Sequence, residues 1–235
     1  MGMRLIGPVY LVGGQDFNMV YLDWPANDCN TYLLNTGDPL VLMDCGCGES
    51  LPGILENLRE MGLDPRDVSR VFLTHAHLPH AGAAEDLRRN GVEVVAGPAT
   101  AAAVREGGIA TAAYHYHRRF VRVAEVTAMA PEEEVTIGAC TIRAVPLPGH
   151  SADSMGWEAT CEGRRMLFCG DAVRSPAIPQ HRDRLDYDGE TYARTLMGLL
   201  DDPPDVLYPG HGPFCLSKTE HWIAEELRKL LGTPA

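Results

Sequence analysis

Short apolar runs and amphipathic segments alternate along this chain. Residues 30–35 and 39–44 are strand-like, and the Gly-Asp pair between them favours a turn. Residues 50–62 then repeat their apolar positions at helical spacing, with a serine at the start and a glycine at the end. The pattern therefore predicts two strands followed by a helix.

The same alternation continues through the rest of the chain. Further strand-like runs are expected at 70–74, 92–97, 141–147, 155–161, 164–170 and 205–210. Helices are expected over 81–91, from Pro98, over 189–200, and from Ser217, where Glu220 completes a capping box. No linker, charge block or low-complexity tract interrupts the pattern. It predicts one domain over residues 1–235, in which helices sandwich the strands.

Composition narrows the range of partners. The 235 residues carry a formal net charge of -12, with a pI near 5.1. Such an acidic chain is a poor candidate for binding nucleic acid or an anionic membrane. No run approaches the roughly 20 apolar residues of a membrane span, and the N-terminal stretch is too short for a signal peptide. We therefore expect a cytoplasmic protein that acts on a small-molecule substrate, either alone or as a homo-oligomer.

The cysteines are odd in number and scattered. Such a set does not form a disulfide framework, and it favours a reducing cytoplasm. Cys45 and Cys47 are interpreted as small buried hydrophobic residues, although a Cys-x-Cys pair also occurs in metal sites. The seven positions are Cys29, Cys45, Cys47, Cys140, Cys161, Cys169 and Cys215.

Histidines gather just after the predicted strands. Four strand-like runs each end in a loop that carries ligand-type side chains: His75, His77 and His80, then His150, Asp171 and His211. Strand ends that meet at one edge of a sheet bring such residues together. Neutral imidazoles and a carboxylate suit zinc, iron or manganese, whereas calcium prefers oxygen ligands. Alternate spacing places the first two rings on one side of the chain, whereas His80 starts the next helix and is expected to serve a second metal ion.

Four motifs carry a family resemblance. The stretches THAHLPH (74–80), PGHSADS (148–154), CGDA (169–172) and YPGHGP (208–213) resemble, in order and spacing, the metallo-β-lactamase superfamily. The glyoxalase II and lactonase branches are more similar than the true β-lactamases. The resemblance implies an α/β fold, an αββα sandwich of two mixed sheets flanked by helices, with metal ions at one edge.

The resemblance also assigns ligands. It implies one metal site from His75, His77 and His150, a second from His80 and His211, and Asp171 as the bridge between them. Asp44 matches a carboxylate that the family buries near the metal-binding loops. A turn-ending Asp is the alternative interpretation of that residue.

Pro79 departs from the family pattern H-x-H-x-D-H. The usual Asp binds the second metal ion and orients the attacking hydroxide, and proline has no side chain that does either. The first site keeps its four ligands, so we expect a weakened second site. Asp153, three residues after His150, is a possible substitute ligand.

The expected activity is hydrolysis of a small ester, thioester or lactone. A bound divalent ion, zinc in the first instance, lowers the pKa of its water to about 7, and the resulting metal-bound hydroxide is the nucleophile. His150 and Asp171 are the expected catalytic residues. Two alternatives remain. One is an iron-dependent oxidoreductase that resembles persulfide dioxygenases, with His75, His150 and Asp171 as ligands; the other is an inactive ligand-binding relative.

Two further segments are candidates for the substrate pocket. One follows Asp171 and contains His181, Arg182, Tyr187 and Tyr192. The other is the run YHYH, residues 114–117, for which a solvated loop is an equal alternative.

Overall fold

The computed structural model describes residues 2–14, 28–174 and 185–232, and in them two β-sheets lie face to face. The first sheet has seven strands in the order β1-β2-β3-β4-β5-β6-β7, and the second has five in the order β12-β11-β10-β9-β8. The strands of the first sheet are β1 (Met3–Arg4), β2 (Val9–Gly13), β3 (Thr31–Asn35), β4 (Leu40–Met43), β5 (Val68–Leu73), β6 (Glu93–Ala96) and β7 (Thr127–Ala128). Those of the second are β8 (Glu134–Ile137), β9 (Cys140–Pro146), β10 (Met155–Cys161), β11 (Arg164–Gly170) and β12 (Val206–Pro209).

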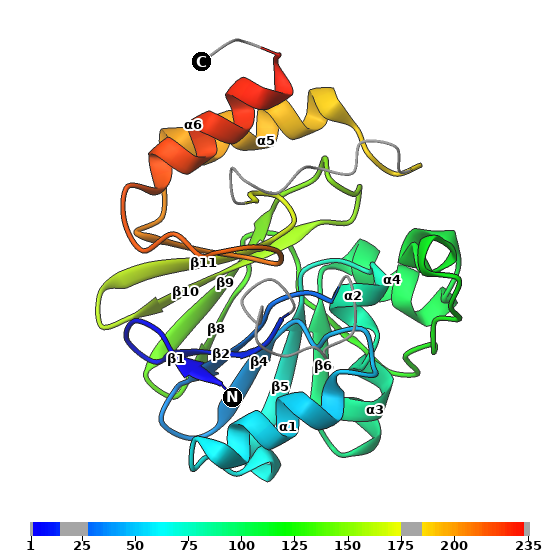
Figure 1. Cartoon of the computed structure of the whole chain (residues 1–235). Helices are drawn as coiled ribbons and strands as arrows, with labels where there is room; N and C mark the ends of the chain where they lie inside the picture. The colour runs from blue at the N-terminus through cyan, green and yellow to red at the C-terminus, as the bar shows by residue number, and fades with distance from the viewer. Residues whose placement is uncertain (1, 15–27, 175–184, 233–235) are drawn as a thin grey trace.

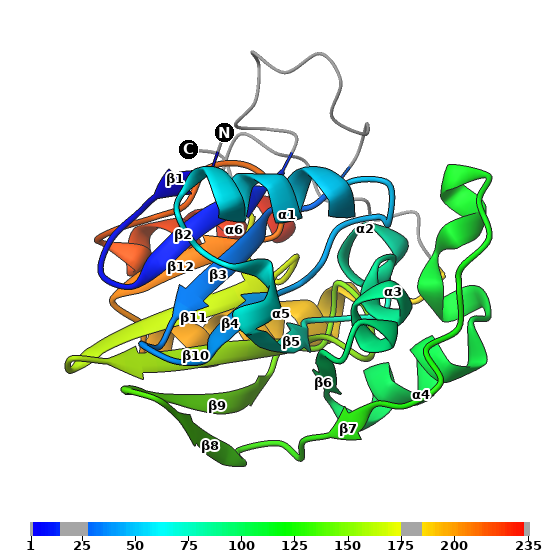
Figure 2. The ribbon, with the colours of Figure 1, turned by 90° about the horizontal axis from the view of Figure 1, so that it is seen from below.

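Helices cover the outer face of each sheet (Figure 1). The α-helices are α1 (Leu51–Glu60), α2 (Leu78–Ala81), α3 (Ala84–Arg89), α4 (Pro98–Glu106), α5 (Gly189–Asp201) and α6 (Thr219–Leu230). Short 3-10 helices are η1 (Pro65–Asp67), η2 (Ile109–Thr111) and η3 (Ala113–Tyr116). Figure 2 shows α1 and α3 in front of the first sheet when the molecule is seen from below. Within the described ranges, no helix is both long and apolar enough to cross a membrane.

Three apolar layers hold this arrangement together. Leu33, Leu42 and Val71 point from the first sheet toward α1, α3 and α4. The opposite face of that sheet packs against the second sheet, with Phe72 and Trp157 in edge-to-face contact at 4.9 Å. A third cluster lies between the second sheet and the pair α5 and α6. These layers make an αββα sandwich of two mixed sheets, which confirms the expected fold class.

Parallel pairing brings the strand ends to one edge. β4 pairs with β5 and β5 with β6 in parallel, and β11 pairs with β12 in parallel. The loops after β5, β11 and β12 therefore start at the carboxyl ends of parallel strands, where such folds place their sites.

Several local predictions need correction. The helix expected over 81–91 is two helices, α2 and α3, joined at Gly82, where a Cβ would lie 2.5 Å from the Cys47 carbonyl carbon. The capping box at Ser217 is wrong, because α6 begins at Thr219 after Lys218, whose φ is 56°. The strands β2 and β8 were not predicted, although the apolar run of β2 lies between a Gly-Pro and a Gly-Gly pair that favour turns.

One disulfide overturns part of the cysteine prediction. Cys140 and Cys161 lie opposite each other on β9 and β10, with Cα atoms 4.6 Å apart, and their sulfurs are bonded. The other five cysteines are thiols. The register of β9 and β10 brings these two cysteines opposite each other, and the spacing of cysteines in the sequence does not reveal that register. The pair removes the cysteine argument for a reducing compartment.

Candidate metal centre

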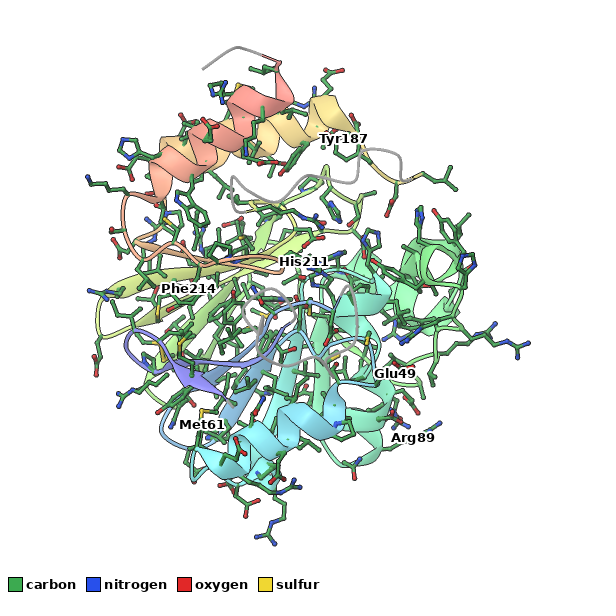
Figure 3. All side chains as sticks on the ribbon, in the orientation of Figure 1. Glu49, Met61, Arg89, Tyr187, His211 and Phe214 are labelled. Carbon is green, nitrogen blue, oxygen red and sulfur yellow. A yellow bond between two sulfur atoms is a disulfide. The ribbon has the colours of Figure 1, made fainter. Side chains whose placement is uncertain are left out.

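The six predicted ligand residues gather at the edge where the strands end. His75 and His77 follow β5, His80 lies in α2, and His150 follows β9. Asp171 follows β11, and His211 follows β12; Figure 3 shows His211 near the middle of the view, between the layer of α5 and α6 and the layer of α1. All but His211 are at most 2% exposed. The convergence expected from the sequence is therefore present, whereas metal binding itself stays a prediction.

Three imidazoles form the first group. Ligand atoms of His75, His77 and His150 lie within 4.8 Å of one another. His77 Nδ1 is 3.2 Å from His150 Nε2, which in turn is 3.2 Å from Asp171 Oδ2. In a tetrahedral zinc site with bonds of 2.0–2.1 Å, neighbouring ligand atoms are about 3.3 Å apart. The spacing of these side chains fits such an ion.

Asp44 and Thr74 set the tautomers of two of the rings. The Thr74 hydroxyl donates to Asp44 Oδ2 (2.9 Å) and therefore accepts from Nδ1 of His75 (3.0 Å). The Nδ1 atom of His80 donates to the same carboxylate oxygen (2.7 Å). In each ring Nε2 is therefore the nitrogen left for the cluster, and neither Nε2 has a hydrogen-bond partner among the described residues. A buried Nε2 that is not engaged by a protein group is what a cation site requires.

These contacts favour the interpretation of Asp44 as a buried carboxylate near the ligand-bearing loops over that of an Asp that only ends a turn. Its carboxylate also accepts the Thr74 backbone amide at 2.8 Å, so it fixes the loop that carries His75 and His77 rather than merely ending a turn. Its φ of 57° belongs to the left-handed region, which short polar side chains tolerate better than most.

A second carboxylate orients His77. Asp186 Oδ2 is 2.9 Å from His77 Nε2, so that nitrogen donates and Nδ1 faces the cluster. Asp153, considered as a substitute ligand, instead accepts the Ala76 backbone amide at 2.9 Å. It holds the loop between His75 and His77 and does not point into the second site.

Asp171 joins the first group of three histidines to a second group, which consists of His80 and His211. Its Oδ2 faces His150, and its Oδ1 lies 3.4 Å from His80 Nε2 and 3.7 Å from His211 Nε2. Gly210 makes this approach possible, because a Cβ there would lie 2.4 Å from the His80 ring and 2.9 Å from Asp171 Oδ1. The residues of a second site are thus assembled around one carboxylate.

Arg174 is a further neighbour of Asp171 that the sequence did not reveal. Its guanidinium Nη2 donates to Asp171 Oδ2, and both side chains are almost fully buried. Burial by itself raises the pKa of Asp171. Arg174, followed by the surrounding imidazoles, outweighs burial and holds that pKa well below its usual range. Asp171 is therefore an anion at neutral pH.

The imidazoles differ in their electrostatic surroundings. Burial, together with the neighbouring His80 and His77, lowers the pKa of His75 well below its usual range, so this ring is neutral and able to bind a metal ion. Burial by itself also lowers the pKa of His80, but the neighbouring Cys29, Asp44 and Asp171 outweigh it and hold that pKa well above its usual range. His80 thus carries a proton readily when no cation faces it.

Cys29 lies beside the second group and was not among the predicted site residues. Its sulfur, a carboxylate oxygen of Asp44 and a ring nitrogen of His80 lie within 4.8 Å of one another. Burial raises the pKa of the Cys29 thiol to about 12, so it is a neutral thiol at pH 7. It is therefore a packing neighbour of His80 in the metal-free protein.

Pro79 points to a pocket rather than to the metal ligands. It occupies the first turn of α2 and is buried. With Leu78, Cys47 and part of the YHYH run, it lines a pocket of about 300 Å³. The residues of that run on the wall are His115, Tyr116 and His117, and Arg118 follows them, held at 2.7 Å by Glu49, which Figure 3 labels near α2. Three residues of the run thus line a pocket, whereas Tyr114, His115 and His117 are exposed, so both interpretations of this segment stay open.

The other predicted pocket segment is only partly correct. Tyr192 is fully buried in the layer between α5, α6 and the second sheet, with its hydroxyl 3.2 Å from Glu226, so it does not line a pocket. Tyr187 packs against the same cluster, and its ring centroid is 6.1 Å from that of Tyr192. His181 and Arg182 lie outside the described residues. The residue of this segment that contacts a candidate ligand is Asp186.

Comparison with known proteins now identifies the fold family. The family model of the metallo-beta-lactamase superfamily matches residues 24–211, which include all six candidate ligands. The chain belongs to this superfamily. The expectation drawn from the four motifs is confirmed at that level, whereas the branch within the superfamily stays a prediction.

Several relatives are named as lactamase-like proteins or thioesterases. A beta-lactamase-like protein 2 homolog of Drosophila melanogaster is 27% identical over 83% of this chain and 63% of its own length. An atrochrysone carboxyl ACP thioesterase of Aspergillus fumigatus is 30% identical over 78% of this chain and 50% of its own length. The chain therefore spans only about half to two thirds of these relatives.

Solved structures agree on the fold. A B3 metallo-beta-lactamase with an active-site glutamic acid is 26% identical, with a TM-score of 0.75 over 98% of this chain and 88% of that one. The subclass B3 metallo-beta-lactamase BJP-1 of Bradyrhizobium japonicum is 24% identical, with a TM-score of 0.75 over 98% and 90%. The second likeness shows the shared fold alone.

Proposed function

We propose that the protein is a divalent-metal-dependent hydrolase of a small ester, thioester or lactone. One observation carries the proposal. The neutral His75 ring, His77 Nδ1, His150 Nε2 and Asp171 Oδ2 meet at spacings that fit a tetrahedral zinc ion, and hydrogen bonds fix the rings of His75 and His77 for that purpose. In a histidine cluster with a purely structural role, a buried nitrogen such as His75 Nε2 would be expected to have a hydrogen-bond partner.

In this proposal the side chains of the protein position a divalent ion and supply the negative charge that helps to bind it. A divalent ion held there provides Lewis-acid activation of water at neutral pH. The side chains of His75, His77 and His150 hold the ion, Asp171 contributes the anionic ligand, and Thr74 and Asp44 keep His75 in the required tautomer. Zinc suits this donor set, and iron or manganese also accepts imidazole and carboxylate ligands.

The pocket beside Pro79 is the proposed place for part of the substrate. It lies along α2, the same short helix that carries His80. Its wall is apolar at Leu78 and Pro79, and it includes Arg118, which is paired with Glu49. Thioesters are the preferred substrates within the proposed class, because two relatives carry thioesterase names.

The test is hydrolysis of a panel of activated thioesters, esters and lactones by zinc-loaded and manganese-loaded protein. Wild-type protein is expected to hydrolyse at least one member, and His150→Ala to lose that activity together with the metal ion. His221→Ala is the matched control, since His221 is exposed on α6. Activity that survives in His150→Ala or after chelation would contradict the proposal.

A second outcome of the panel points to oxidation chemistry. His75, His150 and Asp171 also make a two-histidine, one-carboxylate set, which suits Fe(II) and oxygen. If metal-loaded protein hydrolyses nothing, oxygen uptake by iron-loaded protein with a persulfide separates the oxidoreductase alternative from a ligand-binding protein without activity.

A further inference from the structure

Arg174 is a buried cation in direct contact with the carboxylate that joins the two histidine groups. It lies three residues after Asp171, and its side chain is 3% exposed against 1% for Asp171. A guanidinium keeps its charge at any physiological pH and donates in a fixed planar geometry. The contact therefore places a permanent positive charge inside the candidate metal centre.

The contact uses one oxygen of Asp171 and leaves the other to the second group. Oδ2 receives Arg174 and faces His150, the ligand from the first group. Oδ1 faces His80 and His211 at 3.4 and 3.7 Å. An ion bound by His80 and His211 would have to share this single carboxylate with both the first ion and a guanidinium.

Pro79 acts in the same direction. The position that faces the second group in the motif pattern carries no anionic side chain here, and Pro79 lines the neighbouring pocket instead. Asp44, which is occupied by Thr74 and His80, contacts His80, and Asp171 lies near both His80 and His211. A missing carboxylate and an added guanidinium both make this place less favourable for a second dication.

We propose that Arg174 takes the charge-balancing role of a second metal ion at Asp171, so that the chain binds a single divalent ion tightly, at His75, His77, His150 and Asp171. The inference rests on the proposed function for the first site only. Arg174 is a positioning residue: it holds Asp171 with Oδ2 toward His150 and neutralises the charge that a second ion would otherwise compensate. His80 and His211 then lie beside Oδ1, at 3.4 and 3.7 Å, without a tightly bound ion between them.

The experiment measures zinc bound per chain by elemental analysis after equilibrium dialysis at a series of buffered free zinc concentrations. Wild-type protein is expected to take up one equivalent tightly, with a second only at much higher free zinc. Arg174→Gln keeps the length of the side chain and removes the charge, so it is expected to bind the second equivalent at least about tenfold more tightly. Arg174→Lys keeps the charge and is expected to behave as wild type.

A matched control removes an equivalent interaction elsewhere. Arg143→Gln takes one guanidinium from Glu158, a buried carboxylate in the second sheet, and is expected to leave zinc uptake unchanged. A wild-type protein that binds two zinc ions with similar affinity overturns the inference, and this result needs no variant to fold. Equal second-site affinity in Arg174→Gln and wild type overturns it as well, and so does an increase in Arg174→Lys as large as in Arg174→Gln. A wild-type protein that binds no zinc contradicts the proposed function instead.

Discussion

Replacing Asp44 by Asn tests the hydrogen-bond network that prepares the metal ligands. Asn has nearly the same shape and tolerates the φ of 57°, so the backbone is expected to stay in place. The amide oxygen can still accept the Thr74 backbone amide. The amide nitrogen, however, replaces the oxygen that now accepts from the Thr74 hydroxyl and from His80 Nδ1.

The magnitude follows from these contacts. Two buried donors lose their acceptor, and each such loss costs about 1–3 kcal/mol, so the metal-free protein is expected to lose about 2–6 kcal/mol of unfolding free energy. Removing a partner that orients metal ligands typically lowers metal affinity by about 10–100-fold. His75 and His80 can both adopt the other tautomer in the variant, which would place a hydrogen on the nitrogen that faces the cluster.

The assay is competition for zinc with a chromophoric chelator, combined with urea unfolding of the metal-free protein. Asp64→Asn is the control, because Asp64 also accepts several hydrogen bonds, from Arg66, but on an exposed turn. Zinc affinity of Asp44→Asn equal to that of wild type and of the control would refute the argument that Asp44 sets the tautomers.

Three further results are expected. Pro79→Asp should tighten binding of a second zinc ion, since it returns a carboxylate beside His80; unchanged uptake in a folded variant would show that Pro79 does not weaken that site. Asp186→Asn should lower zinc affinity less than Asp44→Asn does, because Asp186 is 25% exposed and water can replace it, and the chelator titration checks the order. Arg88 hydrogen bonds lower the pKa of Glu85 to about 2. Because this carboxyl is more acidic in the folded state, its stabilisation is present above about pH 4.5 and is lost as pH falls toward 2. Glu85→Gln should therefore lower unfolding free energy by about 2 kcal/mol at pH 7 and by much less near pH 3, and an equal loss at both would contradict this.

The sequence was informative where the chemistry lies in local motifs. His75, His77 and His80 sit together because they follow one strand, and the structure places them at the edge that the strand pattern predicts. The alternation of apolar runs and amphipathic segments predicted strands sandwiched by helices, whereas the division into two facing sheets was implied by the family resemblance. These features could be predicted because strand ends and helix starts depend on residues that are close together in the sequence.

The missed residues depend on contacts between distant segments. Asp186 reaches His77 across 109 positions, and the disulfide partners are brought together by the register of β9 and β10. Arg174 follows Asp171 closely in sequence, yet no spacing rule indicates that its side chain turns back into the site rather than outward. Tyr192 shows the opposite error: its place in a candidate segment indicated a pocket, whereas the fold buries it in the core.

The most direct test is a crystal structure of zinc-loaded protein, with the ion located by anomalous scattering at the zinc edge. The account predicts an ion about 2.0–2.2 Å from His75 Nε2, His77 Nδ1, His150 Nε2 and an oxygen of Asp171. An ion bound elsewhere, with these four side chains more than about 4 Å away, would contradict it.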